Sequence, residues 1–190
     1  KSARTLELDK EDRKLVADLN LLTDKPVLYV CNVDERSAAT GNAYTEAVRA
    51  AIADEKAEML VIAAATEADI AELESYEERQ LFLEDLGLKE SGVARLIKSA
   101  YKLLSLETFF TTGADETRAW TYSRGMKAPQ TAGVIHTDFE KGFIRAEVIK
   151  YADYVSLGSE KACRDAGKIG IEGKEYIVQD GDIMHFLFNV

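Results

Sequence analysis

The sequence predicts an α/β segment followed by an α+β domain with the strand order of a β-grasp fold. Two continuous apolar runs, 27–31 and 59–64, flank one amphipathic helix, which is the pattern of a strand–helix–strand unit with parallel strands. After residue 105 the sequence becomes rich in β-branched and aromatic residues, which favour strands. There the expected elements run two strands, helix, strands, the β-grasp (ubiquitin-like) order. We therefore place a domain boundary near residue 105.

The first expected element is a helix over residues 10–22. Asp9 is a suitable N-cap for it. Helical spacing puts four apolar residues on one face: Leu15, Val16, Leu19 and Leu22. Pro26 then ends helical structure and opens the strand over 27–31. Its unbroken apolar run is typical of a strand buried on both faces of a parallel sheet.

The next helix follows from residues that recur at helical spacing, namely Tyr44, Ala47, Val48, Ala51 and Ile52. The run 59–64 predicts the second strand, and a helix over 67–73 comes after it. Ser75 and Glu78 have the spacing of a capping box, so another helix begins there and ends near Gly87. Ser91 can cap one more helix, whose apolar face holds Val93, Leu96, Ile97, Ala100, Tyr101 and Leu104.

The second half predicts mainly strands. The runs 108–112 and 117–122 read as a hairpin joined by residues 113–116. A short helix is expected over 129–134 and an alternating strand over 142–148. Ser159 caps a short helix that ends at Gly167. Residues 175–178 and 183–190 are expected to form the closing strands.

Two parallel strands do not make a stable sheet alone. A parallel sheet needs further strands and helices over both of its faces. The first half is therefore expected to be the tail of a larger α/β domain, and the chain a fragment of a longer protein.

Charge and composition exclude several classes of function. The chain carries 24 Lys and Arg against 34 Asp and Glu, a formal net charge of −10, which argues against non-specific binding of bare nucleic acid. No apolar run approaches the roughly 20 residues of a membrane span. Cys31 and Cys163 are too few and too far apart for a disulfide framework or a zinc site. We expect a cytoplasmic protein with neither DNA nor a membrane as partner.

The clearest chemical motif is Asn32-Val33-Asp34-Glu35, directly after a buried strand. Ligands of open α/β folds bind outside that end of the strands. An Asn carboxamide offers two donors and an acceptor, and can pair with the Hoogsteen edge of a purine. P-loop GTPases carry Asn-Lys-x-Asp here, and its Asp reads the guanine amine. Without that Lys, and with Glu last, guanine should be read poorly. Alternatively, Asn32 simply terminates the strand.

Residues 25–35, Lys-Pro-Val-Leu-Tyr-Val-Cys-Asn-Val-Asp-Glu, resemble the base-recognition segment of the Obg-like ATPase (YchF) family of P-loop NTPases. The last third of the chain resembles that family's TGS domain more closely. The segments that carry this second resemblance are 117–121, 127–130, 132–140, 142–148, 179–182 and 186–190. The resemblance implies that residues 1–24 end a helical insertion. Residues 25–104 would be the C-terminal part of the nucleotide-binding domain, and residues 105–190 the TGS β-grasp domain.

The resemblance also implies an ATP site. Asn32 would contact the adenine edge, Val33 would pack on the base, and Glu35 stands where guanine would otherwise be read. Ala63 and Ala64 occupy the family's next base-contacting loop, usually Ser-Ala. Backbone contacts survive the replacement of that Ser by Ala63, whereas a hydroxyl contact does not.

The phosphate site of such a protein is not in this sequence. A P-loop has the pattern Gly-x-x-x-x-Gly-Lys-Ser/Thr. Gly167-Lys168 is followed by Ile169, and Ala162 stands at the first glycine position, so we expect Gly167 to be a helix C-cap. The resemblance implies that the P-loop, the switches and the Mg²⁺ ligands lie upstream of Lys1. The parent would be a GTP-binding-protein-like hydrolase of ATP, and this chain should be inactive alone.

The family resemblance implies a ribosomal partner, the large subunit, for the parent. Basic residues that could contact RNA are Arg118, Arg124, Lys127, Lys141 and Arg145. They could equally be scattered surface charges, or the domain could bind protein and have no nucleotide role of its own. Trp120 is expected in the β-grasp core rather than on a base-stacking platform. His136 and His185 have no nucleophile or paired base nearby, and His136 could form hydrogen bonds at a helix end or turn.

Overall fold

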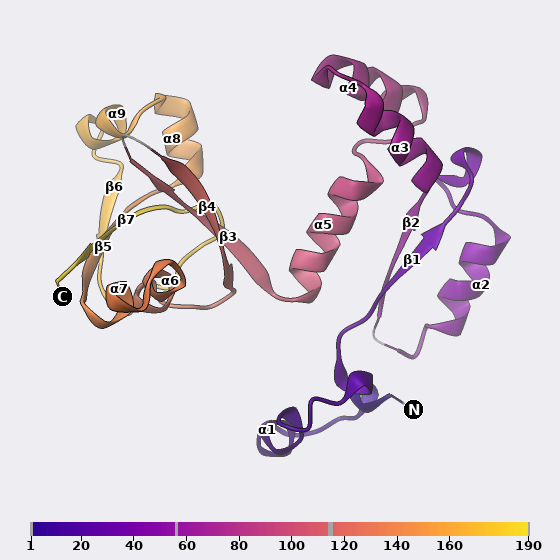
Figure 1. Cartoon of the computed structure of the whole chain (residues 1–190), viewed down its shortest axis with the longest axis horizontal. Coiled ribbons are helices and arrows are strands. Elements are labelled where there is room, and N and C mark those ends of the chain that lie inside the picture. Colours follow the sequence, from indigo (N-terminus) through magenta and orange to yellow (C-terminus); the bar gives the residue numbers. More distant parts are fainter. Residues whose placement is uncertain (1, 56, 114–115, 190) are drawn as a thin grey trace. The chain divides into compact units, whose positions relative to one another are not determined.

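The computed structural model describes residues 2–55, 57–113 and 116–189 (Figure 1). The chain forms two compact units, Lys1–Leu104 and Ser105–Val190. The first unit contains a two-stranded sheet and the second a five-stranded sheet. The connection predicted at 113–116 includes residues 114 and 115, which lie outside the described residues.

The first unit begins with a small helical segment. Its elements are η1 (Ala3–Thr5), α1 (Lys10–Ala17) and η2 (Leu22–Asp24). Asp9 caps α1 as predicted, because its carboxylate accepts the N–H groups of Glu11 and Asp12. The helix ends before the predicted residue 22, and Asn20, with a φ of 49°, turns the chain.

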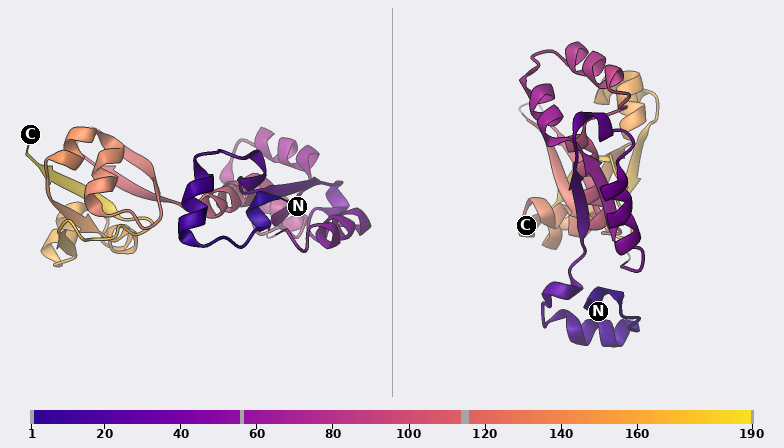
Figure 2. Two further views of the ribbon diagram at one scale, coloured as in Figure 1. Left: turned by 90° about the horizontal axis from the view of Figure 1, so that it is seen from below. Right: turned by 90° about the vertical axis from the view of Figure 1, so that its right-hand side faces the viewer.

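The apolar face predicted for this helix is not buried. Leu15, Leu19 and Leu22 are 74%, 64% and 84% exposed. A polar contact ties the segment to the rest of the unit instead. Arg4 Nη2 lies 2.6 Å from Glu55 Oε2, which also accepts the hydroxyl of Tyr29 at 2.9 Å. Figure 2 shows this segment, in indigo, beyond the start of β1.

The predicted pair of parallel strands is confirmed. The strands β1 (Leu28–Asn32) and β2 (Glu58–Ile62) pair in parallel, with Asn32 opposite Ile62. Both strands therefore end at the same edge. The prediction that β1 is buried on both faces is wrong for this chain, because Val30 is 43% exposed. Figure 1 shows α2 and α5 on opposite sides of the two strands.

The remaining α-helices of the described part of this unit are α2 (Ala43–Ala51), α3 (Ala64–Glu72), α4 (Tyr76–Asp85) and α5 (Gly92–Leu103). The capping box between Ser75 and Glu78 is formed as predicted, and hydrogen bonds from the Ser75 backbone and hydroxyl lower the pKa of Glu78. Ser91 caps α5 as predicted. The sequence thus located the starts of α4 and α5 correctly, whereas α3 begins three residues before the predicted residue 67.

The second unit is built on one mixed sheet in the order β4-β3-β7-β5-β6. The strands are β3 (Leu106–Thr112), β4 (Thr117–Ser123), β5 (Phe143–Ile149), β6 (Ile169–Glu172) and β7 (Ile183–Phe188). β3 and β7 are parallel at the centre, and the other neighbours are antiparallel. This order is consistent with the β-grasp order expected from the sequence.

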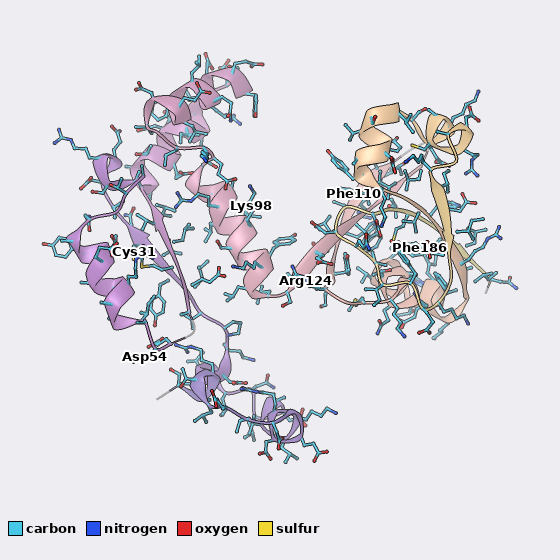
Figure 3. All side chains as sticks on the ribbon, turned by 180° about the vertical axis from the view of Figure 1, so that it is seen from behind. Cys31, Asp54, Lys98, Phe110, Arg124 and Phe186 are labelled. Atoms are coloured by element: carbon cyan, nitrogen blue, oxygen red, sulfur yellow. The ribbon has the colours of Figure 1, made fainter. Side chains whose placement is uncertain are left out.

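Two apolar clusters lie on opposite faces of this sheet. The larger one contains Phe109, Tyr122 and Phe186 and is covered by α6 (Ala128–Ile135) and α7 (Thr137–Lys141). The smaller one contains Ile149, Cys163 and Ile183, with Phe110 packed against it. Its helices are α8 (Tyr151–Leu157) and α9 (Glu160–Asp165). Figure 3 labels Phe186 and Phe110, one residue from each cluster.

The end of the chain departs from the sequence prediction. Residues 175–178 form no regular strand, and only an isolated bridge joins Lys127 to Ile177. The edge strand beside β5 is β6, which comes earlier in the chain than residues 175–178, and α8 was not predicted. Gly167 follows α9 with a φ of 67°, and Lys168 N–H donates to Cys163 O at 2.8 Å, so the helix C-cap prediction is confirmed.

Candidate functional site at the ends of the parallel strands

A hydrogen bond joins the Asn32 motif to the start of α3. Asn32 Oδ1 accepts the N–H of Ala64 at 2.9 Å, across 32 residues of sequence. Val33 N–H donates to Ile62 O at 2.8 Å and extends the pairing beyond β1. The structure thus brings Asn32, Val33, Ala63 and Ala64 together at one edge of the sheet.

Asn32 itself was expected directly after the strand over 27–31. It is instead the last residue of β1, and its carboxamide oxygen is engaged. The side chain is exposed, and its two Nδ2–H donors have no hydrogen-bond partner among the described residues. Because the Ala64 N–H fixes the oxygen, the two N–H donors of the amide and the second lone pair of the oxygen are left to meet a ligand.

The other predicted base contacts differ in exposure. Ala63 is 3% exposed and precedes α3 without a side-chain cap, whereas Ala64 is exposed. Val33 is half-buried. Glu35 is exposed and starts η3 (Glu35–Ser37), which Asp34 caps through the Ser37 N–H at 3.0 Å. Ala63 can therefore act through its backbone, while Glu35 presents a carboxylate to solvent.

Sequence reasoning missed one carboxylate beside this edge. Glu67, on α3, accepts the N–H of Gly92 at 2.6 Å and the N–H of Val93 at 3.1 Å, the first two residues of α5. Arg95 of α5 donates to the carbonyl of Val61 in β2. A glycine directly after the N-cap Ser91 was the available signal, because Gly at the start of a helix often marks a close approach of the backbone.

The five basic residues proposed for RNA contact differ in their charge partners. Arg118 lies 3.8 Å from a carboxylate oxygen of Glu116, and its guanidinium lies 4.7 Å from the centre of the Trp120 ring. Arg124 donates to Glu107 at 2.7 Å. Lys127 pairs with Glu175. These three cations are already partly neutralised.

Lys141 and Arg145 differ from the other three because neither forms an ion pair within residues 2–55, 57–113 and 116–189. Arg145 lies opposite Leu187 in the pairing of β5 with β7, whereas the neighbouring Ala146 lies opposite Phe186 of the larger core. Arg145 therefore points to the sheet face that does not carry the larger core. In the described part of the chain, Lys141 and Arg145 are thus the two of these five cations whose charge no carboxylate offsets.

The remaining predicted residues have structural surroundings. Trp120 is half-buried against the larger core, stacked on Phe109, and its Nε1–H donates to Thr111 Oγ1 at 2.9 Å. His136 accepts the N–H of Asp138 and caps α7, so its place at a helix end is confirmed. His185 is exposed in β7.

The described part of the chain holds no group of three or more His, Cys, Asp or Glu side chains that could bind a metal ion. None of its helices combines the length and the apolar character needed to cross a bilayer.

The chain is similar over its whole length to proteins from several bacteria. "Ribosome-binding ATPase YchF" of Bacillus subtilis (strain 168) is 53% identical over 192 residues, which is 100% of this chain and 52% of that protein. The protein of the same name from Escherichia coli O157:H7 is 49% identical over 187 residues, 98% of this chain and 51% of that protein. The chain thus spans about half the length of these relatives.

The chain is also similar to solved structures and to a described protein family. The "Structure of the Schizosaccharomyces pombe YchF GTPase" matches with a TM-score of 0.85 and 36% identity, over 97% of this chain and 49% of that one. A GTP-binding protein from Pyrococcus horikoshii OT3 shares only the fold, with a TM-score of 0.62 and 16% identity over 96% of this chain and 57% of that one. The family YchF-GTPase_C, described as "Protein of unknown function (DUF933)", matches residues 106–189. The chain belongs to the YchF family and corresponds to the C-terminal portion of a YchF protein.

Proposed function

We propose that this chain supplies the adenine-recognition edge of an ATP-binding P-loop NTPase. Asn32, Val33, Glu35, Ala63 and Ala64 would form that edge. The observation that carries the proposal is the Asn32–Ala64 hydrogen bond, which joins the two segments a purine would meet. Relatives named as ribosome-binding ATPases support the nucleotide class.

The Asn32 carboxamide supports adenine over guanine through its oxygen rather than through its donor to N7, which both purines can accept. Because the Asn32 oxygen accepts from Ala64, the Nδ2–H group is free to donate to N7 of a purine. The remaining lone pair of the oxygen can accept from the exocyclic amine of adenine. Guanine has a carbonyl at the same ring position, and a carbonyl oxygen cannot donate a hydrogen bond to the Asn32 oxygen. The carboxylate of Glu35 replaces the Asp with which related GTPases read guanine.

The second unit would be a TGS module of the β-grasp type, and the boundary near 105 would separate it from residues 25–104 of the nucleotide-binding domain. Residues 1–24 would close a helical insertion. We propose that this module contributes to binding of the cytoplasmic ribosome, at the large subunit, in the intact protein. The names of the relatives support ribosome binding. Lys141 and Arg145 are the first candidates for RNA contact.

Phosphate binding and hydrolysis are assigned to the rest of the intact protein. The P-loop backbone amides, its Lys and the Mg²⁺ ligands would come from there, because Gly167 and Lys168 serve as a helix C-cap in this chain. When bound, Mg²⁺ would neutralise charge on the phosphates. The residues of this chain would bind and orient the base only.

Calorimetric titration of the intact protein with ATP and GTP tests the proposal. We expect ATP to bind more tightly than GTP. Equal affinities, or a preference for GTP, would contradict the adenine site. A second candidate is an RNA- or protein-interaction module with no nucleotide role, and the unpaired Lys141 and Arg145 favour it. That candidate would be supported if ribosome binding persisted while neither nucleotide bound.

A further inference from the structure

A set of contacts behind the predicted base site joins α3 to α5. The N–H of Glu67 donates to Ala63 O at 3.0 Å and closes the first turn of α3. Its carboxylate accepts two N–H groups at the start of α5, that of Gly92 at 2.6 Å and that of Val93 at 3.1 Å. One residue therefore contacts both the loop proposed to meet the base and the start of α5.

The start of α5 depends on this carboxylate. The first N–H groups of a helix have no partner within the helix, so other groups must satisfy them. Ser91 Oγ accepts the Ala94 N–H at 3.1 Å. Glu67 satisfies the two before it, and the negative charge is also favoured by the helix dipole. Glu67 is thus a second cap of α5, supplied by a different helix.

The approach is close enough to require glycine. A Cβ added at Gly92 would lie 2.8 Å from Glu67 Oε1 and 2.8 Å from Ile62 Cγ2, so the Glu67 and Ile62 side chains would have to shift. Arg95, one turn further along α5, donates to the carbonyl of Val61. Hydrogen bonds therefore join the start of α5 both to α3, through Glu67, and to the end of β2, through Arg95.

We propose that Glu67 is a positioning residue for the base site. By joining the first turn of α3 to α5, it fixes Ala63 and Ala64, and the Ala64 N–H in turn orients the Asn32 carboxamide. Without this anchor the carboxamide can turn and present its oxygen where its nitrogen should donate. This inference rests on the proposed adenine site, although Glu67 acts through Ala64 and not on the base.

The first test uses the intact protein without nucleotide. Amide hydrogen exchange, followed by NMR, would compare the unchanged protein with Glu67→Ala and Glu67→Gln. We expect Glu67→Ala to speed exchange about tenfold or more at Gly92, Val93 and Ala64, and Glu67→Gln, which keeps one acceptor, to speed it less. The control Glu72→Ala, an exposed residue of the same helix, should change none of the three. Faster exchange at Gly92 and Val93 with Ala64 unchanged would overturn the positioning role.

The second test uses the intact protein, with ATP and inorganic tripolyphosphate as probes. Glu67→Ala should weaken ATP binding about tenfold and leave tripolyphosphate binding unchanged, because tripolyphosphate has no base. Gly92→Ala should give the same pattern, and it serves if Glu67→Ala does not fold. Equal weakening of both probes would show a general structural defect and overturn the proposal.

The two proposals fail separately. If Asn32→Ala weakens ATP binding but neither Glu67→Ala nor Gly92→Ala does, the positioning role is wrong and the base site stands. If none of these variants weakens it, the base site itself is wrong.

Discussion

Lys150 Nζ lies 2.7 Å from Asp182 Oδ1, and the side chain of Asp182 is 1% exposed. The other oxygen of Asp182 accepts the Tyr176 hydroxyl at 2.6 Å and the Gln179 N–H at 3.0 Å. The backbone carbonyl of Asp182 accepts the N–H of Phe110 at 2.8 Å. Asp182 therefore joins three segments: its carboxylate binds Lys150 at the end of β5 and the loop before β7, and its backbone carbonyl binds β3.

Replacing this carboxylate should destabilise the second unit. Asp182→Asn would place an N–H₂ group against donors in a buried site, so we expect a loss of about 2–3 kcal/mol in unfolding free energy. Urea unfolding followed by the fluorescence of Trp120, the single tryptophan, would measure it. Asp165→Asn, an exposed carboxylate at the end of α9, is the control and should change stability by less than about 0.5 kcal/mol. Equal stabilities of the two variants would refute the role of Asp182.

The same network predicts how stability depends on alkaline pH. Burial and a hydrogen bond to Glu107 raise the pKa of Tyr122, and burial together with Asp182 raises the pKa of Tyr176. Burial lowers the pKa of Lys150, but its hydrogen bonds to Asp182 and Tyr176 outweigh this and raise it overall. A folded-state pKa above the unfolded value means that the folded protein holds its proton more tightly. Stability is thus full below about pH 10 and falls as the pH rises further.

Tyr122→Phe tests this sign, because it removes one titrating hydroxyl. We expect its urea midpoint to fall less between pH 9 and pH 11 than that of the unchanged chain. Tyr151→Phe, at an exposed tyrosine, is the control and should leave the slope unchanged. A steeper decline in Tyr122→Phe would mean that the sign is wrong.

Local signals in the sequence predicted the helix starts better than the sheet edge. Ser75, Ser91 and Ser159 cap helices through hydrogen bonds that span only three residues, so spacing alone reveals them. The strand β6 has four residues and contains Gly170, which weakens the strand signal. Its position depends on pairing with β5, and such pairing is a long-range property. Residues 175–178 had the stronger local pattern but form only an isolated bridge.

In the candidate site, too, the sequence did not reveal contacts between residues far apart in the chain. The family resemblance named Asn32, Val33, Ala63 and Ala64, and the parallel pairing of β1 with β2 places them at one edge. The direction of the Asn32 oxygen could not be predicted, since its partner Ala64 is 32 residues away. Glu67 looks like any other helix-surface carboxylate until Gly92 is placed beside it. The features of the site that the sequence did not predict are therefore contacts between different helices and strands.

Two substitutions at Asn32 separate its two roles. Asn32→Ala in the intact protein should weaken ATP binding by about 1–3 kcal/mol, the cost of an unpaired polar contact. Asn32→Asp keeps an acceptor for the Ala64 N–H but loses the donor, and should weaken ATP binding at least as much. Calorimetry measures both, with tripolyphosphate as a ligand whose affinity should not change. Unchanged ATP affinity in both variants would remove Asn32 from the site.

The two unpaired cations of the second unit predict a salt-dependent contact with the ribosome. Charge reversal by Lys141→Glu together with Arg145→Glu should lower co-sedimentation of the intact protein with ribosomes severalfold at low salt. The difference should shrink as salt is added, because counterion release drives such contacts. Lys161→Glu, an exposed cation of α9, is the control. Binding that is unaffected by the double reversal would exclude these residues as the RNA contact.

This chain alone should not hydrolyse ATP at a meaningful rate. Catalysis of phosphoryl transfer comes from positioning and charge stabilisation around the phosphates, which need backbone amides, a Lys and a metal ion. The residues proposed here contact only the base, and Asn32 is exposed to water that competes for each hydrogen bond. Each such bond is then worth about 1 kcal/mol, which does not offset the loss of translational and rotational freedom. We therefore expect a dissociation constant of about 1 mM or weaker for ATP. Calorimetric titration with ATP and GTP, together with a phosphate-release assay, checks both points. Micromolar binding or sustained turnover would mean that residues 1–190 contain a phosphate site, and the assignment of phosphate binding to the rest of the intact protein would be wrong.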